Sequence, residues 1–119
     1  MLYINNDNIN PYFNLATEEY MLKNFTDNCF MLWRNESCIV VGKNQNTLSE
    51  INYDYVKENK IPVVRRLSGG GAVFHDLGNI NFTFLCSQKN ISQNRKLGSG
   101  AGKPGSYTYC FFQIFLENL

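Results

Sequence analysis

Residues 65–76 read RRLSGGGAVFHD, and this stretch holds the densest cluster of chemically informative residues in the chain. Three consecutive glycines, at positions 69–71, let the backbone adopt positive φ angles and let a ligand approach the main chain closely. Successive backbone N–H groups in such a loop can point at one anion. Arg65 and Arg66 precede the loop. Neighbours on a strand face opposite sides, so we expect one guanidinium to face the pocket, where its planar fork suits phosphate. With His75, the only histidine, the stretch predicts an anion-binding loop, with a nucleotide as the favoured ligand.

Each of these features also has a purely structural interpretation when it stands alone. Three glycines usually form a flexible turn, two adjacent arginines are usually a solvated pair, and a single strand histidine is more often structural than catalytic. Their combination within eleven residues, inside a well-patterned domain, favours the ligand-binding interpretation.

On both sides of this loop the hydrophobic pattern predicts an α+β domain with a mostly antiparallel sheet flanked by helices. The predicted strands cover residues 1–4, 29–34, 38–42, 63–66, 72–75 and 80–85, and the predicted helices cover 11–24 and 49–59. Asn10 and Pro11 mark the start of the first helix, and Ser49 is the predicted cap of the second. The strands at 29–34 and 38–42 are expected to form a hairpin through the turn at 35–37.

The first helix carries apolar residues at helical spacing. We expect Phe13, Ala16 and Tyr20 to form its apolar face, which Leu15 and Leu22 broaden, with Glu18 and Glu19 on the other side.

Composition excludes several classes of protein. The chain has 119 residues, a formal net charge of +1 and 44% hydrophobic residues, which fits one globular domain and argues against nucleic-acid and acidic-membrane partners. No apolar run approaches the roughly 20 residues that span a bilayer, and no signal peptide is visible, so we expect a cytoplasmic protein. The four cysteines lack metal-ligand spacing, so we expect free thiols and no protein metal site. The high asparagine content is attributed to codon usage rather than to physics.

Several motifs together resemble one family. The stretch RRLSGGGAVFHDLGNINFTF resembles the signature of lipoate–protein ligase A, within the biotin/lipoate ligase and octanoyltransferase superfamily. The blocks PYFNLATEE (11–19), LWRN (32–35) and VGKNQN (41–46) resemble further blocks of that family, in the same order. The resemblance covers residues 1–85 and implies a biotin/lipoate ligase-like catalytic domain that is incomplete in this chain.

The resemblance implies an enzyme that makes lipoyl-adenylate from ATP and lipoate. The lipoyl group then passes to a lysine of an acceptor domain, such as the E2 component of 2-oxoacid dehydrogenases or the glycine cleavage H protein. Mg²⁺ is expected to bridge the ATP phosphates. The arginine matching Arg66 is expected to contact the activated phosphate. The implied ATP- and lipoyl-adenylate-binding residues are Arg66, Ser68, Gly70, Gly71, Ala72, Val73, Phe74, His75 and Asn79.

The resemblance also implies an acyl slot and a nearby hairpin. The loop at 42–46 would border the acyl tunnel, and Asn81 would lie where the hairpin approaches the same pocket. The side chains proposed as walls of this slot, each with a core role as the alternative, are Trp33, Val41, Phe74, Phe82 and Phe84.

The sequence departs from the family pattern after residue 86. We therefore divide it into a partial catalytic domain at 1–86 and a divergent Gly-rich tail with an aromatic C-terminus at 87–119. The family's essential lysine lies further downstream. Lys96 is its candidate, because RKLGSGA (95–101) echoes the lysine segment, while the alternative is that these residues end a family helix.

Two other functions stay open from the sequence. One is an octanoyl or lipoyl transferase of the same superfamily, with Cys86 or Cys110 as its thiol, and the other is a non-catalytic fragment or binding module. A sheet cut after its central strands exposes an edge, and the aromatic segment at 107–119 either covers that edge or promotes association. We expect low stability or self-association of the isolated chain.

Overall fold

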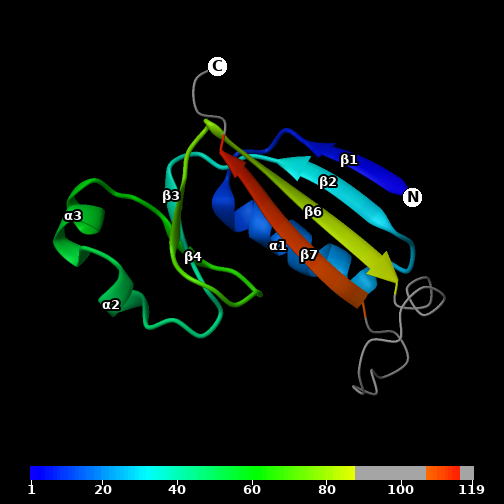
Figure 1. Cartoon of the computed structure of the whole chain (residues 1–119). Coiled ribbons are helices and arrows are strands. Elements are labelled where there is room, and N and C mark those ends of the chain that lie inside the picture. The colour runs from blue at the N-terminus through cyan, green and yellow to red at the C-terminus, as the bar shows by residue number, and fades with distance from the viewer. Residues whose placement is uncertain (88–106, 116–119) are drawn as a thin grey trace.

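The computed structural model describes residues 1–87 and 107–115, with side chains described for residues 1–86 (Figure 1). The candidate lysine Lys96 and most of the predicted tail lie outside the described residues. No helix in this described part is long and apolar enough to cross a membrane. The elements in chain order are β1 (Leu2–Asn6), α1 (Pro11–Asn24), β2 (Cys29–Trp33), β3 (Cys38–Val41), α2 (Thr47–Glu50), α3 (Tyr53–Glu58), β4 (Val63–Arg65), β5 (Val73–His75), β6 (Asn79–Ser87) and β7 (Tyr107–Phe115).

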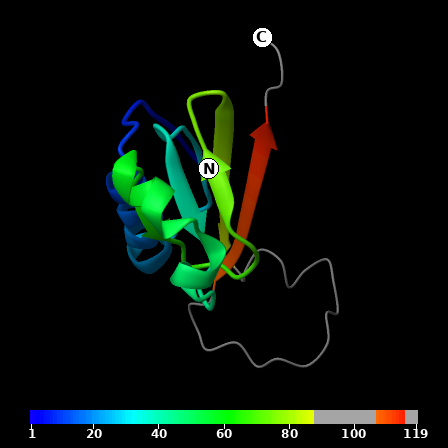
Figure 2. The same ribbon diagram turned by 90° about the vertical axis from the view of Figure 1, so that its left-hand side faces the viewer.

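The described strands form two sheets, where the sequence predicted one. The first has the strand order β1-β2-β6-β7 and the second has the order β4-β3-β5. Three of the five strand pairings are antiparallel, and the pairs β1–β2 and β3–β4 are parallel. The α+β class is therefore confirmed, with more parallel pairing than expected. Helices α2 and α3 lie together beside β3 and β4, far from β7 (Figures 1 and 2).

The expected hairpin between residues 29–34 and 38–42 is wrong. Strand β2 pairs with β1 and β6, while β3 pairs with β4 and β5 in the other sheet. The connection between them is anchored in the interior, because Asn35 is fully buried and hydrogen-bonds to residues from α1 and β5, although Glu36 and Ser37 are exposed. Tertiary contacts of one side chain thus redirect the chain from one sheet to the other.

Helix α1 has the bounds that the sequence predicted. Asn10 has extended backbone angles, and its side chain accepts hydrogen bonds from the Tyr12 and Phe13 N–H groups, with Pro11 at the first helical position. The helix lies behind the four-stranded sheet in Figure 1. Its Met21 packs in a core with side chains of β2 and β6, namely Cys29, Met31, Trp33 and Leu85.

The predicted apolar face of α1 is right only in part, because Leu15 and Leu22 pack against the core but other members of that face do not. Phe13 and Tyr20 are more than half exposed, while Asn14 and Glu18 face the interior with Met21. Burial of these polar groups is compatible with folding because each has hydrogen-bond partners. Glu18 accepts a hydrogen bond from the Thr83 hydroxyl, and the Asn14 amide contacts three acceptors.

The predicted second helix is wrong in its length and its cap. Two short helices, α2 and α3, replace it, because Asn46 and Asn52 each cap a separate start. The Asn46 side chain accepts from the Leu48 N–H, and the Asn52 side chain accepts from the Tyr55 N–H. All three described helices thus begin at an asparagine, so codon usage alone does not account for this residue type.

Strand β7 covers the edge of β6. The two strands pair antiparallel from Asn79–Phe115 to Ser87–Tyr107. The aromatic segment therefore covers the edge that β6 would otherwise expose.

We expect Asn10→Ala to lower the free energy of unfolding by about 1 kcal/mol, because two N–H groups at the start of α1 lose their acceptor. Denaturant unfolding followed by circular dichroism measures this change. Asn10→Asp is the matched control, because it keeps an acceptor and adds negative charge at a helix N-terminus. An Asn10→Ala protein as stable as its parent would contradict the capping role.

Candidate functional site

Two loops from the three-stranded sheet meet at the candidate site. The glycine loop, residues 66–72, follows β4, and the polar loop, residues 42–46, follows β3. The Lys43 N–H donates to the Ser68 carbonyl at 2.9 Å, and the Arg66 N–H donates to the Val41 carbonyl at 3.0 Å. These bonds hold the two loops side by side.

Gly42 is the point of closest approach between the loops. A Cβ atom placed on Gly42 would lie 2.1 Å from the carbonyl oxygen of Gly70, which is far inside van der Waals contact. Gly70 itself has a φ of 103°, a conformation that side chains disfavour. Glycine is therefore required at both positions for this contact.

Arg66 lies beneath the glycine loop and determines its shape. Its side chain is buried and donates to the carbonyl oxygens of Gly69 at 2.9 Å, Gly71 at 2.7 Å and Val40 at 3.3 Å. A peptide group carries its C=O and the next residue's N–H on opposite sides. The N–H groups of Gly70 and Ala72 therefore point away from the guanidinium, so the loop presents backbone donors opposite a buried positive charge.

Arg65 holds the polar loop in the same way. Its guanidinium donates to the carbonyl oxygens of Gly42 at 2.9 Å and Gln45 at 2.8 Å, and to the Thr47 hydroxyl at 2.8 Å. The expectation that the two arginines face opposite sides agrees with their burial, since Arg65 is exposed and Arg66 is buried. Each arginine thus organises one of the two loops, a role that the sequence did not reveal.

The predicted site residues occupy a continuous stretch, but they differ in exposure. Gly70, Gly71 and Phe74 are exposed, and Ser68, Ala72 and Val73 are half-buried. Arg66, His75 and Asn79 are buried, and the Asn79 amide donates to the Phe74 carbonyl at 3.1 Å. The exposed glycine loop and the buried ends of the stretch therefore form two layers of the candidate site.

His75 belongs to the buried layer. It has no exposed surface, its Nδ1 lies 3.0 Å from the Asn35 amide nitrogen, and its ring contacts the Trp33 ring at a centroid distance of 6.2 Å. Trp33 in turn donates from Nε1 to the Thr83 hydroxyl at 2.9 Å, and Thr83 donates to Glu18. The sequence analysis did not identify Glu18, Thr83 and Asn35 as parts of the site. The one indication in the sequence is a polar residue within an otherwise apolar pattern.

The proposed wall residues of an acyl slot do not gather in one place. Trp33 lies in the core beside α1, whereas Val41 is in the other sheet. Phe82 and Phe84 alternate with the buried residues of β6 and contact Phe30, at centroid distances of 5.9 and 6.5 Å. They therefore lie on the face of the four-stranded sheet that points away from α1.

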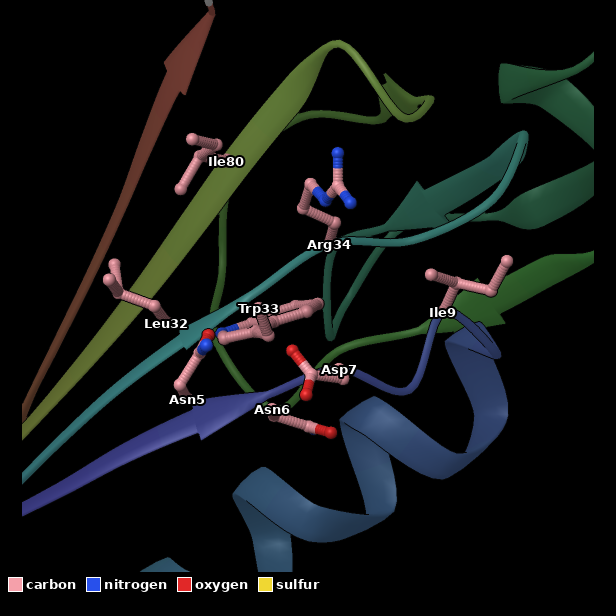
Figure 3. Close-up of a pocket in the computed structure, with 8 residues that line it drawn as sticks. All are labelled: Asn5, Asn6, Asp7, Ile9, Leu32, Trp33, Arg34 and Ile80. Carbon is pink, nitrogen blue, oxygen red and sulfur yellow. The ribbon is translucent and has the colours of Figure 1, made fainter.

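A hollow of about 310 Å³ lies where β1 and β2 end (Figure 3). It contains none of the residues predicted to bind the adenylate, but Trp33, which lines it, contacts His75. The residues around it are Asn5, Asn6, Asp7, Ile9, Leu32, Trp33, Arg34 and Ile80.

The buried thiols are poor nucleophiles. Burial raises the pKa of Cys38 to about 11, and it also raises the pKa of Cys29. A hydrogen bond from Asn35 lowers the pKa of Cys38 by a smaller amount. Both thiols are therefore protonated near neutral pH, which disfavours them as attacking groups.

Comparison with known proteins identifies a family. The model of the lipoyl protein ligase A/B catalytic domain matches residues 10–99. The chain is 57% identical over 88 residues to the lipoate-protein ligase LplJ of Bacillus subtilis, a match that covers 71% of this chain and 27% of that protein. The chain therefore spans about a quarter of the length of this relative.

Solved structures agree with the sequence match. The Plasmodium falciparum LipL1 complex with lipoate has a TM-score of 0.70 and 42% identity, over 78% of this chain and 32% of that one. A lipoate-protein ligase A bound with ATP has a TM-score of 0.63 and 33% identity, over 73% and 35%. A bipartite ligase studied with its E2 lipoyl domain, from Thermoplasma acidophilum, has a TM-score of 0.68 and 30% identity, over 72% and 35%. These matches confirm the predicted fold, and they confirm that the chain covers only part of the catalytic domain.

We expect Gly42→Ala to destabilise the protein by about 1–3 kcal/mol, because the new methyl group would collide with the Gly70 carbonyl and separate the two loops. Gly69→Ala is the matched control, since a Cβ at Gly69 meets no atom within 4 Å. Thermal unfolding of both variants measures the difference. Equal stability of the two variants would show that the loops do not make this contact.

We expect Cys38 to resist alkylation in the folded protein at pH 8 and to react after unfolding. Its folded pKa of about 11 lies above the ordinary value of 9.0, so the folded state keeps a proton that the unfolded state releases. The resulting stabilisation is complete below about pH 9 and is lost as the pH rises towards 11. Mass spectrometry of iodoacetamide-treated protein, with and without denaturant, measures the protection. Rapid native labelling of Cys38 would contradict its burial.

Proposed function

The chain belongs to the lipoyl protein ligase A/B catalytic domain family, and from this we propose that it forms part of an enzyme that activates lipoate with ATP. The lipoyl group would then pass to a lysine of an acceptor domain. The main support for this proposal is the glycine loop. The family match includes the glycine loop, and that loop presents backbone donors over the buried Arg66 guanidinium, as an anion site requires.

The first step that we propose is adenylation. A carboxylate oxygen of lipoate bonds to the α-phosphorus of ATP, the bond to the β-phosphate breaks, and pyrophosphate leaves. Negative charge develops on the phosphoryl oxygens in the transition state. Donors that are already oriented, such as the Gly70 and Ala72 N–H groups, stabilise this charge without reorganising.

Arg66 has two functions in this proposal. Its contacts with the Gly69 and Gly71 carbonyls hold the loop in the donor-presenting shape, and its charge lies directly behind that loop. The direct phosphate contact that the resemblance implies remains part of the proposal. So does the complete binding set of Arg66, Ser68, Gly70, Gly71, Ala72, Val73, Phe74, His75 and Asn79.

In the second step, the lysine amine of the acceptor attacks the lipoyl carbonyl carbon. AMP leaves, the amine loses a proton, and an amide forms. The Thermoplasma ligase studied with its E2 lipoyl domain supports lipoyl domains as the acceptor class. The glycine cleavage H protein and a cytoplasmic location are further parts of the proposal.

The described residues offer no metal site of their own for Mg²⁺. Residues 1–86 contain no cluster of three or more His, Cys, Asp or Glu side chains that could hold a metal ion. The carboxylate within residues 65–76 belongs to Asp76, and it accepts a hydrogen bond from the Gly78 N–H in a turn. Mg²⁺ therefore enters the proposal only as a companion of the ATP phosphates, where it commonly keeps most of its waters.

The extent of the match limits what this chain is proposed to do by itself. It spans 27% of the Bacillus ligase, and the lysine candidate Lys96 lies outside the described residues. We therefore propose ligand binding and adenylation for the chain itself, and transfer activity for the whole catalytic domain to which it corresponds. The division at residues 86 and 87 also remains a prediction.

The test combines a binding assay with a turnover assay. Incubation with ATP, Mg²⁺ and lipoate should give bound lipoyl-adenylate, detected by mass spectrometry, and released pyrophosphate. Ligand binding without pyrophosphate would favour the binding-module alternative. Transfer of octanoate from an acyl carrier protein without ATP would favour the octanoyltransferase alternative. Failure to bind either ATP or lipoate would reject the proposal.

We expect Arg66→Ala to weaken binding of lipoyl-adenylate by about 10- to 150-fold, the equivalent of losing charged hydrogen bonds worth about 1.5–3 kcal/mol. Isothermal titration calorimetry with a non-hydrolysable lipoyl-adenylate analogue measures the affinity. Lys57→Ala serves as the control, because it also removes one positive charge, but on α3. Among the described residues, the Lys57 ammonium group contacts only the Tyr53 ring. If both variants bind like the parent protein, Arg66 does not contribute to the site.

A further inference from the structure

A row of polar side chains crosses the interior from β1 to His75. The Asn6 amide donates to Asn14 Oδ1 at 2.9 Å, the Asn14 amide donates to Asn35 Oδ1 at 2.8 Å, and the Asn35 amide nitrogen lies 3.0 Å from His75 Nδ1. Asn14, Asn35 and His75 have no exposed surface. Water therefore does not compete for the contacts among these three side chains, and each must match its neighbour as donor or acceptor.

Backbone groups determine which way the Asn14 amide points. Its nitrogen lies 2.8 Å from the Asn8 carbonyl oxygen and 2.8 Å from the Arg34 carbonyl oxygen. A carbonyl only accepts, so the atom facing both must be the amino nitrogen. Its two hydrogens are shared among these carbonyls and Asn35, as in three-centre hydrogen bonds.

The Asn6 side chain gives an independent check of this orientation. Asn6 Oδ1 accepts from the Asn8 backbone N–H at 3.1 Å, and a backbone N–H only donates. The other atom of the Asn6 amide is therefore the nitrogen, which must meet an acceptor on Asn14. The atom it meets at 2.9 Å is Asn14 Oδ1, in agreement with the assignment from the carbonyls.

The same reasoning continues to the histidine. Since the Asn14 nitrogen donates, the Asn35 atom that faces it must be oxygen, and the Asn35 nitrogen must then face His75 Nδ1. A donor at 3.0 Å requires an acceptor, and only an unprotonated Nδ1 can accept. We propose that Asn14 and Asn35 are positioning residues that hold His75 as the neutral tautomer with its proton on Nε2.

The surroundings of His75 agree with a neutral ring. Burial disfavours the imidazolium form, which would also place a protonated Nδ1 against the Asn35 amino group. Two further groups lie beside the ring, one from each sheet. The Trp33 ring comes from β2, and Cys38 on β3 is the register partner of His75. The pKa of Cys38 is about 11, so its thiol is uncharged near neutral pH.

This assignment limits the part that His75 can play in the site, if the function proposed above is correct. Nε2 holds its proton, so the ring acts as a hydrogen-bond donor at Nε2 and not as a general base there. The ring also adds no charge. The positive charge of the buried layer therefore comes from Arg66.

The experiment is ¹⁵N nuclear magnetic resonance of the ligand-free chain with ¹⁵N-labelled histidine, since His75 is its only histidine. We expect a pyridine-like, unprotonated Nδ1 signal and a pyrrole-like, protonated Nε2 signal at neutral pH. A protonated Nδ1, an averaged pair of signals or an imidazolium would overturn the assignment. Because no ligand is added, the result does not depend on whether the protein binds lipoate or ATP.

Variants separate the relay from simple burial. Asn35→Asp replaces the donor by a carboxylate that only accepts, so we expect Nδ1 to become protonated. The control, Asn59→Asp, makes the same change at the end of α3 and should leave both signals unchanged. An unchanged tautomer in a folded Asn35→Asp protein would overturn the positioning role. If that variant does not fold, the spectrum of the parent protein still decides the tautomer.

Discussion

The buried amide of Asn14 fixes the segments that lie between the two sheets. It joins the segment before α1, through the Asn8 carbonyl, to the segment that leaves β2, through the Arg34 carbonyl and Asn35. No strand pairing joins β2 to β3, so side-chain contacts join the two sheets: Asn14 holds Asn35, and both Asn35 and Trp33 contact His75 of β5. Burying an unpaired amide would cost about 1–3 kcal/mol, so the contact is favourable only when all three segments are in place.

The candidate site follows from the same use of polar groups inside the fold. Arg65 and Arg66 donate to backbone carbonyls, and each thereby shapes a loop that contains little regular structure. Turning the carbonyls inward leaves backbone N–H groups on the outer side of the glycine loop. The arginines thus contribute to an anion site through the conformation that they impose as well as through their charge.

The sequence predicted features that depend on neighbouring residues and missed those that depend on distant ones. The start of α1 was predictable because Asn10 and Pro11 act within one turn, and the glycine loop was predictable because Gly69–Gly71 permit its conformation locally. The buried face of α1 was not, because Asn14 and Glu18 look like surface residues until Asn35 and Thr83 are brought to them. The false hairpin has the same cause.

The ring contact between Trp33 and His75 makes the site visible to optical methods. The chain contains one tryptophan and one histidine, and they lie against each other in the interior. Indole emission responds to the polarity and charge of its immediate surroundings. The intrinsic fluorescence of the unmodified protein therefore reports on the buried layer of the site, without an added dye or an engineered label.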